Sequence, residues 1–177
     1  MNRLIISLFF IISLTSSSLA EVINKINVKG NNRVSKETII LFGGIKLNQE
    51  TDDVDLNKII KNLYRTNFFQ NVNVKLINNI LEINLVENPL VQSVNIEGVK
   101  NKNILEILRE NMTLKEKSSF VHSVANDDKK KLLNILRSNG YYRATIKQKY
   151  LEGSNNTVDL IYDIYLGEKA SIKKIIF

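Results

Sequence analysis

The residues best suited to acid–base chemistry gather around His122, the single histidine of the chain. Ser119 and Ser123 flank it, and Asp127 and Asp128 follow a few residues later. A Ser–His–Asp site needs side chains that converge in space, which neighbours along one loop do not achieve. Ser123 is also expected to cap the helix that begins after it. We therefore predict no catalytic residues and no enzymatic activity.

Ligands for metal ions and cofactors are equally scarce. The chain has no cysteine and one histidine, so it can form neither a disulfide nor a histidine-based metal cluster by itself. Asp52, Asp53 and Asp55 could suggest a cation site. They fit better at the start of a helix, where the positive end of the helix dipole favours carboxylates. No metal and no cofactor are expected.

A net charge of +7 could indicate a nucleic acid or an anionic membrane surface as partner. The lysines are spread along the chain, however, and the run Lys129–Lys131 falls in an expected helix, where it fits a solvated face. The N-terminal residues also indicate that the chain is exported. Nucleic acid is therefore not an expected partner.

Residues 1–20 have the layout of a signal peptide. A basic start ending at Arg3 precedes the apolar stretch Leu4–Leu14, and small residues lead up to Ala20. The apolar stretch is short for a bilayer-spanning helix, which needs about 20 apolar residues. Cleavage after Ala20 would release an exported mature chain, and an uncleaved anchor is the alternative.

The rest of the chain contains an internal repeat, and this repeat determines the expected fold. The segments Ile26–Gly30 and Val94–Gly98 are alternating strands that end in a turn glycine. A third opening of this kind begins at Ile175-Ile176-Phe177. Apolar residues at helical spacing then predict a short and a long helix in each repeat. The predicted helices cover residues 35–42, 54–64, 102–111 and 124–137.

The exits of the two long helices match in kind. Asn67 and Gly140 stand where the backbone is expected to adopt left-handed angles, which Gly adopts freely and Asn tolerates. An aromatic pair follows each of them, Phe68-Phe69 and Tyr141-Tyr142. These rings are expected to fold back and close the end of the core.

Two alternating strands complete each repeat. They cover about residues 71–76 and 81–85 in the first repeat and 143–150 and 159–166 in the second. The prediction is an α+β chain of two tandem β-α-α-β-β domains, each with a three-stranded sheet covered by two helices. The expected boundaries are 21–88 and 89–167, with residues 168–177 forming the first strand of an incomplete third domain.

Three segments together resemble a known family. They are Val28–Val34, Leu63–Val74 and Gly140–Ala144, and in this order after a signal peptide they resemble the POTRA (polypeptide-transport-associated) domains of BamA-type outer-membrane assembly factors. Asn67 and Asn71 depart from the Gly and Asp that the family often carries, and both changes are compatible with the turn. A full family member carries more POTRA domains and a membrane barrel, so the resemblance implies a fragment attached to the membrane only through a C-terminal barrel that is absent here.

The resemblance also implies what such a chain binds. Family members hold unfolded outer-membrane proteins and contact Bam complex lipoproteins and periplasmic chaperones. If the first strand of each sheet lies beside the third, the second strand is left at an edge, ready to accept an extended peptide. The candidate contact residues are Arg33, Asn71, Asn73, Lys75, Arg143, Thr145 and Lys147.

Alternatives remain for the role of these residues and for the kind of exported machinery to which such a chain belongs. The polar residues along the edges can equally be gatekeepers against aggregation, and Arg33 can be an ordinary loop arginine. Other exported machines also use POTRA domains, namely TamA-type factors, two-partner secretion transporters and the FtsQ-type division protein. The last of these would require the uncleaved anchor.

Overall fold

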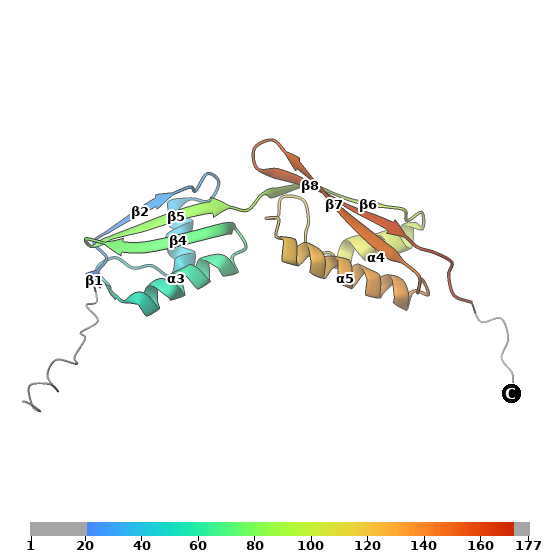
Figure 1. Cartoon of the computed structure of the whole chain (residues 1–177), viewed down its shortest axis with the longest axis horizontal. Helices are drawn as coiled ribbons and strands as arrows, with labels where there is room; N and C mark the ends of the chain where they lie inside the picture. The colour runs from blue at the N-terminus through green and yellow to red at the C-terminus, as the bar shows by residue number, and fades with distance from the viewer. Residues whose placement is uncertain (1–20, 172–177) are drawn as a thin grey trace, which may run out of the picture. The chain divides into compact units, whose positions relative to one another are not determined.

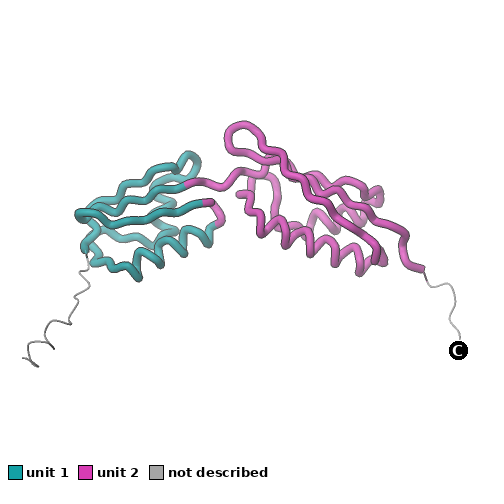
Figure 2. Tube along the Cα trace, in the orientation of Figure 1, with its two compact units in different colours: residues 1–66, 71–85 teal, residues 67–70, 86–177 magenta. Residues whose placement is uncertain are grey.

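The computed structural model describes residues 21–171. The expected signal peptide (1–20) and residues 172–177 of the expected third opening strand (168–177) lie outside this range. The described residues of that segment, 168–171, belong to no strand. The described residues form two compact units, 21–66 with 71–85 and 67–70 with 86–171 (Figure 2). Within residues 21–171, every helix is too short or too polar to span a bilayer.

The order of elements confirms two successive β-α-α-β-β patterns (Figure 1). The first consists of β2 (Lys25–Lys29), α2 (Lys36–Gly43), α3 (Asp53–Arg65), β4 (Phe69–Ile77) and β5 (Ile80–Glu87). The second consists of β6 (Leu90–Glu97), α4 (Lys102–Asn111), α5 (His122–Ser138), β7 (Thr145–Gly153) and β8 (Thr157–Tyr165). Two further strands, β1 (Glu21–Val22) and β3 (Glu50–Thr51), pair antiparallel in a small sheet of their own. Strands this short leave no periodic pattern, and they are missing from the sequence-based prediction.

Each three-stranded sheet has its third strand in the middle. The first sheet has the order β2-β5-β4 and the second the order β6-β8-β7. The outer strands β2 and β6 run parallel to the central strands, with Ile26 opposite Leu81 and Val94 opposite Leu160. The last two strands of each sheet form a hairpin. The sequence predicted an open second strand only if the first strand lies beside the third. Both sheets have this order.

Polar side chains begin three of the four main helices. Asp52 accepts a hydrogen bond from the Asp55 N–H at 2.9 Å, Ser35 caps α2, and Asn101 caps α4 in the same way. The prediction for α5 was wrong in detail, because this helix begins at His122 and Val121 precedes it without a side-chain cap. Ser123 therefore lies within the first turn, and His122 belongs to the helix and not to a loop.

The helix exits adopt the expected backbone. Asn67 has φ of 59° and Gly140 has φ of 91°, so both lie in the left-handed region. The prediction for the aromatic pairs holds only in part. Phe69 is buried, whereas Tyr142 is 67% exposed and cannot close the core.

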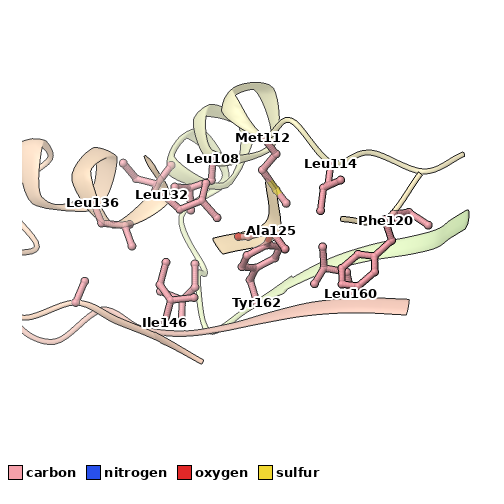
Figure 3. Packing of buried hydrophobic residues seen from close by; sticks show 14 of the residues in the cluster. Leu108, Met112, Leu114, Phe120, Ala125, Leu132, Leu136, Ile146, Leu160 and Tyr162 are labelled. Atoms are coloured by element: carbon pink, nitrogen blue, oxygen red, sulfur yellow. The ribbon is translucent and has the colours of Figure 1, made fainter. Parts of the chain in front are cut away.

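The core of the second unit lies between the sheet and its two helices (Figure 3). Leu132 and Leu136 of α5 and Leu108 of α4 face Ile146, Leu160 and Tyr162 of the sheet. The fully buried Tyr162 hydroxyl lies 3.4 Å from the Ala125 carbonyl oxygen. Burial raises the pKa of Tyr162, so this phenol stays neutral and able to donate a hydrogen bond.

Candidate functional site

Open strand edges are the feature of this fold that can do binding chemistry. The sheet orders leave β4 and β7 as border strands, each paired with one neighbour only. A border strand directs every second backbone N–H and C=O away from the sheet. These groups can pair with another extended chain, which makes both strands candidate peptide-binding edges. On β4, the Val72 N–H already donates a hydrogen bond of 3.2 Å to the Tyr64 hydroxyl.

The opposite borders, β2 and β6, carry contacts of their own. The Lys36 ammonium donates a hydrogen bond of 2.7 Å to the Ile26 carbonyl oxygen on β2. At the start of β6, Val91 donates to the Ser118 carbonyl oxygen and accepts from the Lys117 N–H, both at 2.8 Å. Neighbouring groups therefore already use part of both edges. The sequence predicted only the second strand of each sheet as an edge, and it did not predict these contacts.

The predicted contact residues of the first sheet lie together on β4. Asn71, Asn73 and Lys75 are exposed and alternate with the buried residues Val72 and Val74. The alternation places the three polar side chains on the face of the sheet away from the helices. They line the border strand as expected, and their role in binding or in protection against aggregation stays a prediction.

On β7 the structure brings together two of the three predicted residues. Thr145 and Lys147 are exposed and lie opposite Tyr165 and Asp163 of β8. Arg143 was predicted to belong to this strand, but β7 begins at Thr145 and Arg143 is an exposed residue of the preceding turn. A β-strand pattern cannot locate this boundary, because the turn that follows Gly140 continues into residues of strand-like composition.

The charges on β7 are partly compensated within the sheet. The Lys149 ammonium lies 3.6 Å from the Asp163 carboxylate of the central strand. Both side chains are largely exposed, so the pair contributes little to stability, at most about 1 kcal/mol. Arg33 is exposed in the bend between β2 and α2, next to the border strand of the first sheet opposite β4.

The residues that could have formed a catalytic triad have other partners. The His122 ring contacts Phe120, with ring centroids 4.8 Å apart, and Tyr150, at 5.2 Å. The buried Asp128 carboxylate accepts hydrogen bonds from the N–H groups of Thr113 and Leu114. Sequence proximity therefore does not turn these residues into a Ser–His–Asp arrangement.

The acidic cluster before α3 is also explained by the helix. Asp52 caps the helix, and Asp55 forms an ion pair of 2.8 Å with Lys58. The hydrogen bond from Lys58 lowers the pKa of the Asp55 carboxyl. Among residues 21–171, no group of three or more His, Cys, Asp or Glu side chains is placed to hold a metal ion.

Comparison with known proteins finds a family match for the second repeat. Residues 89–167 match the model of the POTRA family, described as a surface antigen variable number repeat. The first sheet has the same strand order as the second, so both repeats share the topology of the matched region. The resemblance to POTRA domains is thereby confirmed.

Two curated relatives are outer membrane protein assembly factors. The chain is 28% identical over 142 residues to the outer membrane protein assembly factor BamA of Neorickettsia risticii, covering 79% of this chain and 18% of that protein. It is 27% identical over 176 residues to BamA of Neisseria meningitidis, covering 98% of this chain and 22% of that protein. The chain thus spans about a fifth of the length of the curated relatives it matches.

A solved structure supports the same fold. The N-terminal domain of Omp85 from Thermosynechococcus elongatus matches 81% of this chain and 61% of its own, with a TM-score of 0.55 and 13% sequence identity. At this identity the match concerns the fold alone. The α+β fold with POTRA topology, predicted from the repeat, is confirmed.

Proposed function

We propose that this chain is a periplasmic docking module of the outer-membrane β-barrel assembly machinery, and that it binds extended segments of unfolded outer-membrane proteins as an added strand. The observation that carries the proposal is the strand order, which leaves β4 and β7 with one neighbour each. Binding through backbone groups does not depend on a particular sequence, so it suits a module with many different clients.

The surfaces of the two edges fit this role. Asn71, Asn73 and Lys75 on β4 and Thr145 and Lys147 on β7 are polar and exposed. Such side chains discourage permanent edge-to-edge pairing of folded copies but leave the backbone accessible to a flexible client. Both edges can therefore serve transient binding without forming aggregates.

The relatives named as outer membrane protein assembly factors support the proposed partners and location. We propose export through a signal peptide cleaved after Ala20 and residence in the periplasm at the outer membrane. Lipoprotein subunits of the Bam complex and periplasmic chaperones are the proposed protein partners, and Arg33 and Arg143 are exposed candidates for such contacts. The proposed module has no enzymatic activity of its own.

Binding along the border strands has a direct test. A nine-residue peptide of alternating polar and apolar residues is titrated into the chain from residue 21 to residue 177 while the backbone amide signals are followed by NMR. We expect shifts concentrated in β4 (Phe69–Ile77) and β7 (Thr145–Gly153). A peptide with N-methylated amides at alternate positions should bind at least about tenfold more weakly, because several backbone hydrogen bonds are lost.

The control for this experiment is a surface that offers no unpaired backbone. A photo-crosslinking side chain at Asn73 or Lys147 should capture the peptide, whereas one at the exposed helix residues Lys61 or Lys130 should not. Equal affinity for the methylated peptide, or capture mainly on the helices, would contradict binding by strand addition.

A further inference from the structure

Three rings form a cluster beside β7, the border strand of the second sheet. The Phe120, His122 and Tyr150 rings lie 4.8, 5.1 and 5.2 Å apart between centroids, with interplanar angles from 55° to 88°. These distances and tilts are those of favourable edge-to-face aromatic contacts. We name Phe120, His122 and Tyr150 together the aromatic shelf.

The aromatic shelf extends from the core of the second unit to its surface. Phe120 is buried, Tyr150 is half-buried, and His122 is exposed as the first residue of α5. Partial burial raises the pKa of the Tyr150 hydroxyl. The shelf therefore has an inner ring fixed by packing and two outer rings that solvent can reach.

The position of Tyr150 links the shelf to the open edge. On β7, Ile146, Gln148 and Tyr150 alternate with exposed residues, so they face the helices. The Gln148 amide confirms this direction, because it donates a hydrogen bond of 2.6 Å to the Ala125 carbonyl oxygen on α5. A strand added beside β7 would place one of its own helix-facing side chains next to Tyr150, with Cβ atoms about 5 Å apart.

The border strand of the first sheet has a different set of rings: Phe68 and Phe69 contact edge to face at its start, with centroids 6.2 Å apart, and the Tyr64 hydroxyl accepts a hydrogen bond from the Val72 N–H. The helix-facing residues of β4 between its ends are aliphatic, Val72, Val74 and Leu76, and α3 begins with Asp53 where α5 begins with His122. The two edges thus offer backbone groups in different side-chain environments, and on β4 the Val72 N–H is already bonded to the Tyr64 hydroxyl. This contrast within one chain separates the general contribution of an open edge from the contribution of the shelf.

We infer that the β7 edge selects extended client segments that carry an aromatic side chain at the helix-facing position beside Tyr150. The fourth ring would pack against the exposed parts of Tyr150 and His122 in the tilted geometry that the three rings already adopt. This inference rests on the proposed strand addition and gives one of the two edges a preference that the other lacks.

The test uses three peptides that differ only at the residue placed beside Tyr150, which is Phe, Leu or Ser. Affinity for the full chain from residue 21 is read from the amide signals of β7 alone. The Phe peptide should bind about two- to tenfold more tightly than the Leu peptide, as expected for an aromatic contact beyond simple burial. Signals of β4 should respond to the Phe and Leu peptides equally.

Variants locate the preference. Tyr150→Val keeps a residue that favours strands, and His122→Ala changes an exposed side chain, so the fold should tolerate both. Each should bring the ratio of Phe to Leu affinities close to one. Tyr142→Ala removes an exposed tyrosine outside the shelf and should leave the ratio unchanged.

The outcomes separate this inference from the proposed function. Equal binding of the Phe and Leu peptides at β7, with shifts still along the strand, would overturn the aromatic preference and leave strand addition intact. A preference that persists in both Tyr150→Val and His122→Ala would also overturn it. If no peptide shifts the signals of β4 or β7, strand addition fails and the inference fails with it.

Discussion

Gly98→Ala should unfold or severely loosen the second sheet, at a cost of about 3–5 kcal/mol in the free energy of unfolding. Gly98 directly follows β6 and has φ of 82°. A Cβ atom there would lie 1.9 Å from the Ile164 carbonyl oxygen of the central strand. The clash is with backbone, which cannot rotate away as a side chain can. The left-handed conformation adds about 1–2 kcal/mol for any residue with a Cβ.

The repeat provides a second copy of this test in the first sheet. Gly30 has φ of 83°, and its added Cβ would lie 1.9 Å from the Leu85 carbonyl oxygen. Hydrogen exchange monitored residue by residue should show lost protection in the second sheet for Gly98→Ala and in the first sheet for Gly30→Ala. The matched control is Gly44→Ala, where φ is 69° but the added Cβ would meet only the Asn62 side-chain nitrogen, at 3.7 Å, so the cost should be only about 1–2 kcal/mol. Equal losses at Gly44 and Gly98 would contradict the role of the close backbone approach.

Asp128→Ala should destabilise the second unit by about 2–4 kcal/mol. The Asp128 side chain is 1% exposed, and its two carboxylate oxygens accept hydrogen bonds of 2.8 to 3.0 Å from the Thr113 and Leu114 N–H groups. The carboxylate thereby fixes the segment after α4 against α5. Alanine would leave these N–H groups without their acceptor inside a region from which water is largely excluded, and this loss is costly.

Urea unfolding followed by circular dichroism and residue-level hydrogen exchange would measure this effect. Asp128→Asn keeps one acceptor oxygen and should lose less stability than Asp128→Ala. Asp127→Ala is the matched control, because Asp127 is 71% exposed and pairs only with Lys130, and its change should stay within about 0.5 kcal/mol. A similar loss for Asp127→Ala and Asp128→Ala would show that the buried carboxylate is not the cause.

The sequence predicted the local features of the fold, because residues close together along the chain determine them. The amphipathic stripe of α3 and the alternation of β4 and β5 follow from backbone periodicity, and they appear at the expected places. Asn67, Asn78 and Asn79 adopt the positive φ expected of turn residues. The start of α5 was misjudged because its N-cap position, Val121, makes no side-chain hydrogen bond and carries no recognisable signal.

The sequence predicted only part of the candidate site. The polar residues along β4 and β7 could be named from alternation, although Arg143 falls before its strand. The aromatic shelf could not be named, because Tyr150 lies far along the chain from Phe120 and His122 and meets them only when β7 packs against α5. The burial of Asp128 was not predicted either, because the Thr113 and Leu114 N–H groups that it binds come from the segment after α4.

By itself the sequence determined a duplicated β-α-α-β-β plan, its turns and its resemblance to POTRA domains, because each of these is written in residues close together along the chain. The tertiary structure alone decided the strand order, and with it which backbone edges stay open. It also decided which rings gather beside β7 and which carboxylate is buried. The physical reason is that strand pairing and packing join residues distant in the sequence, and local propensity carries no record of those partners.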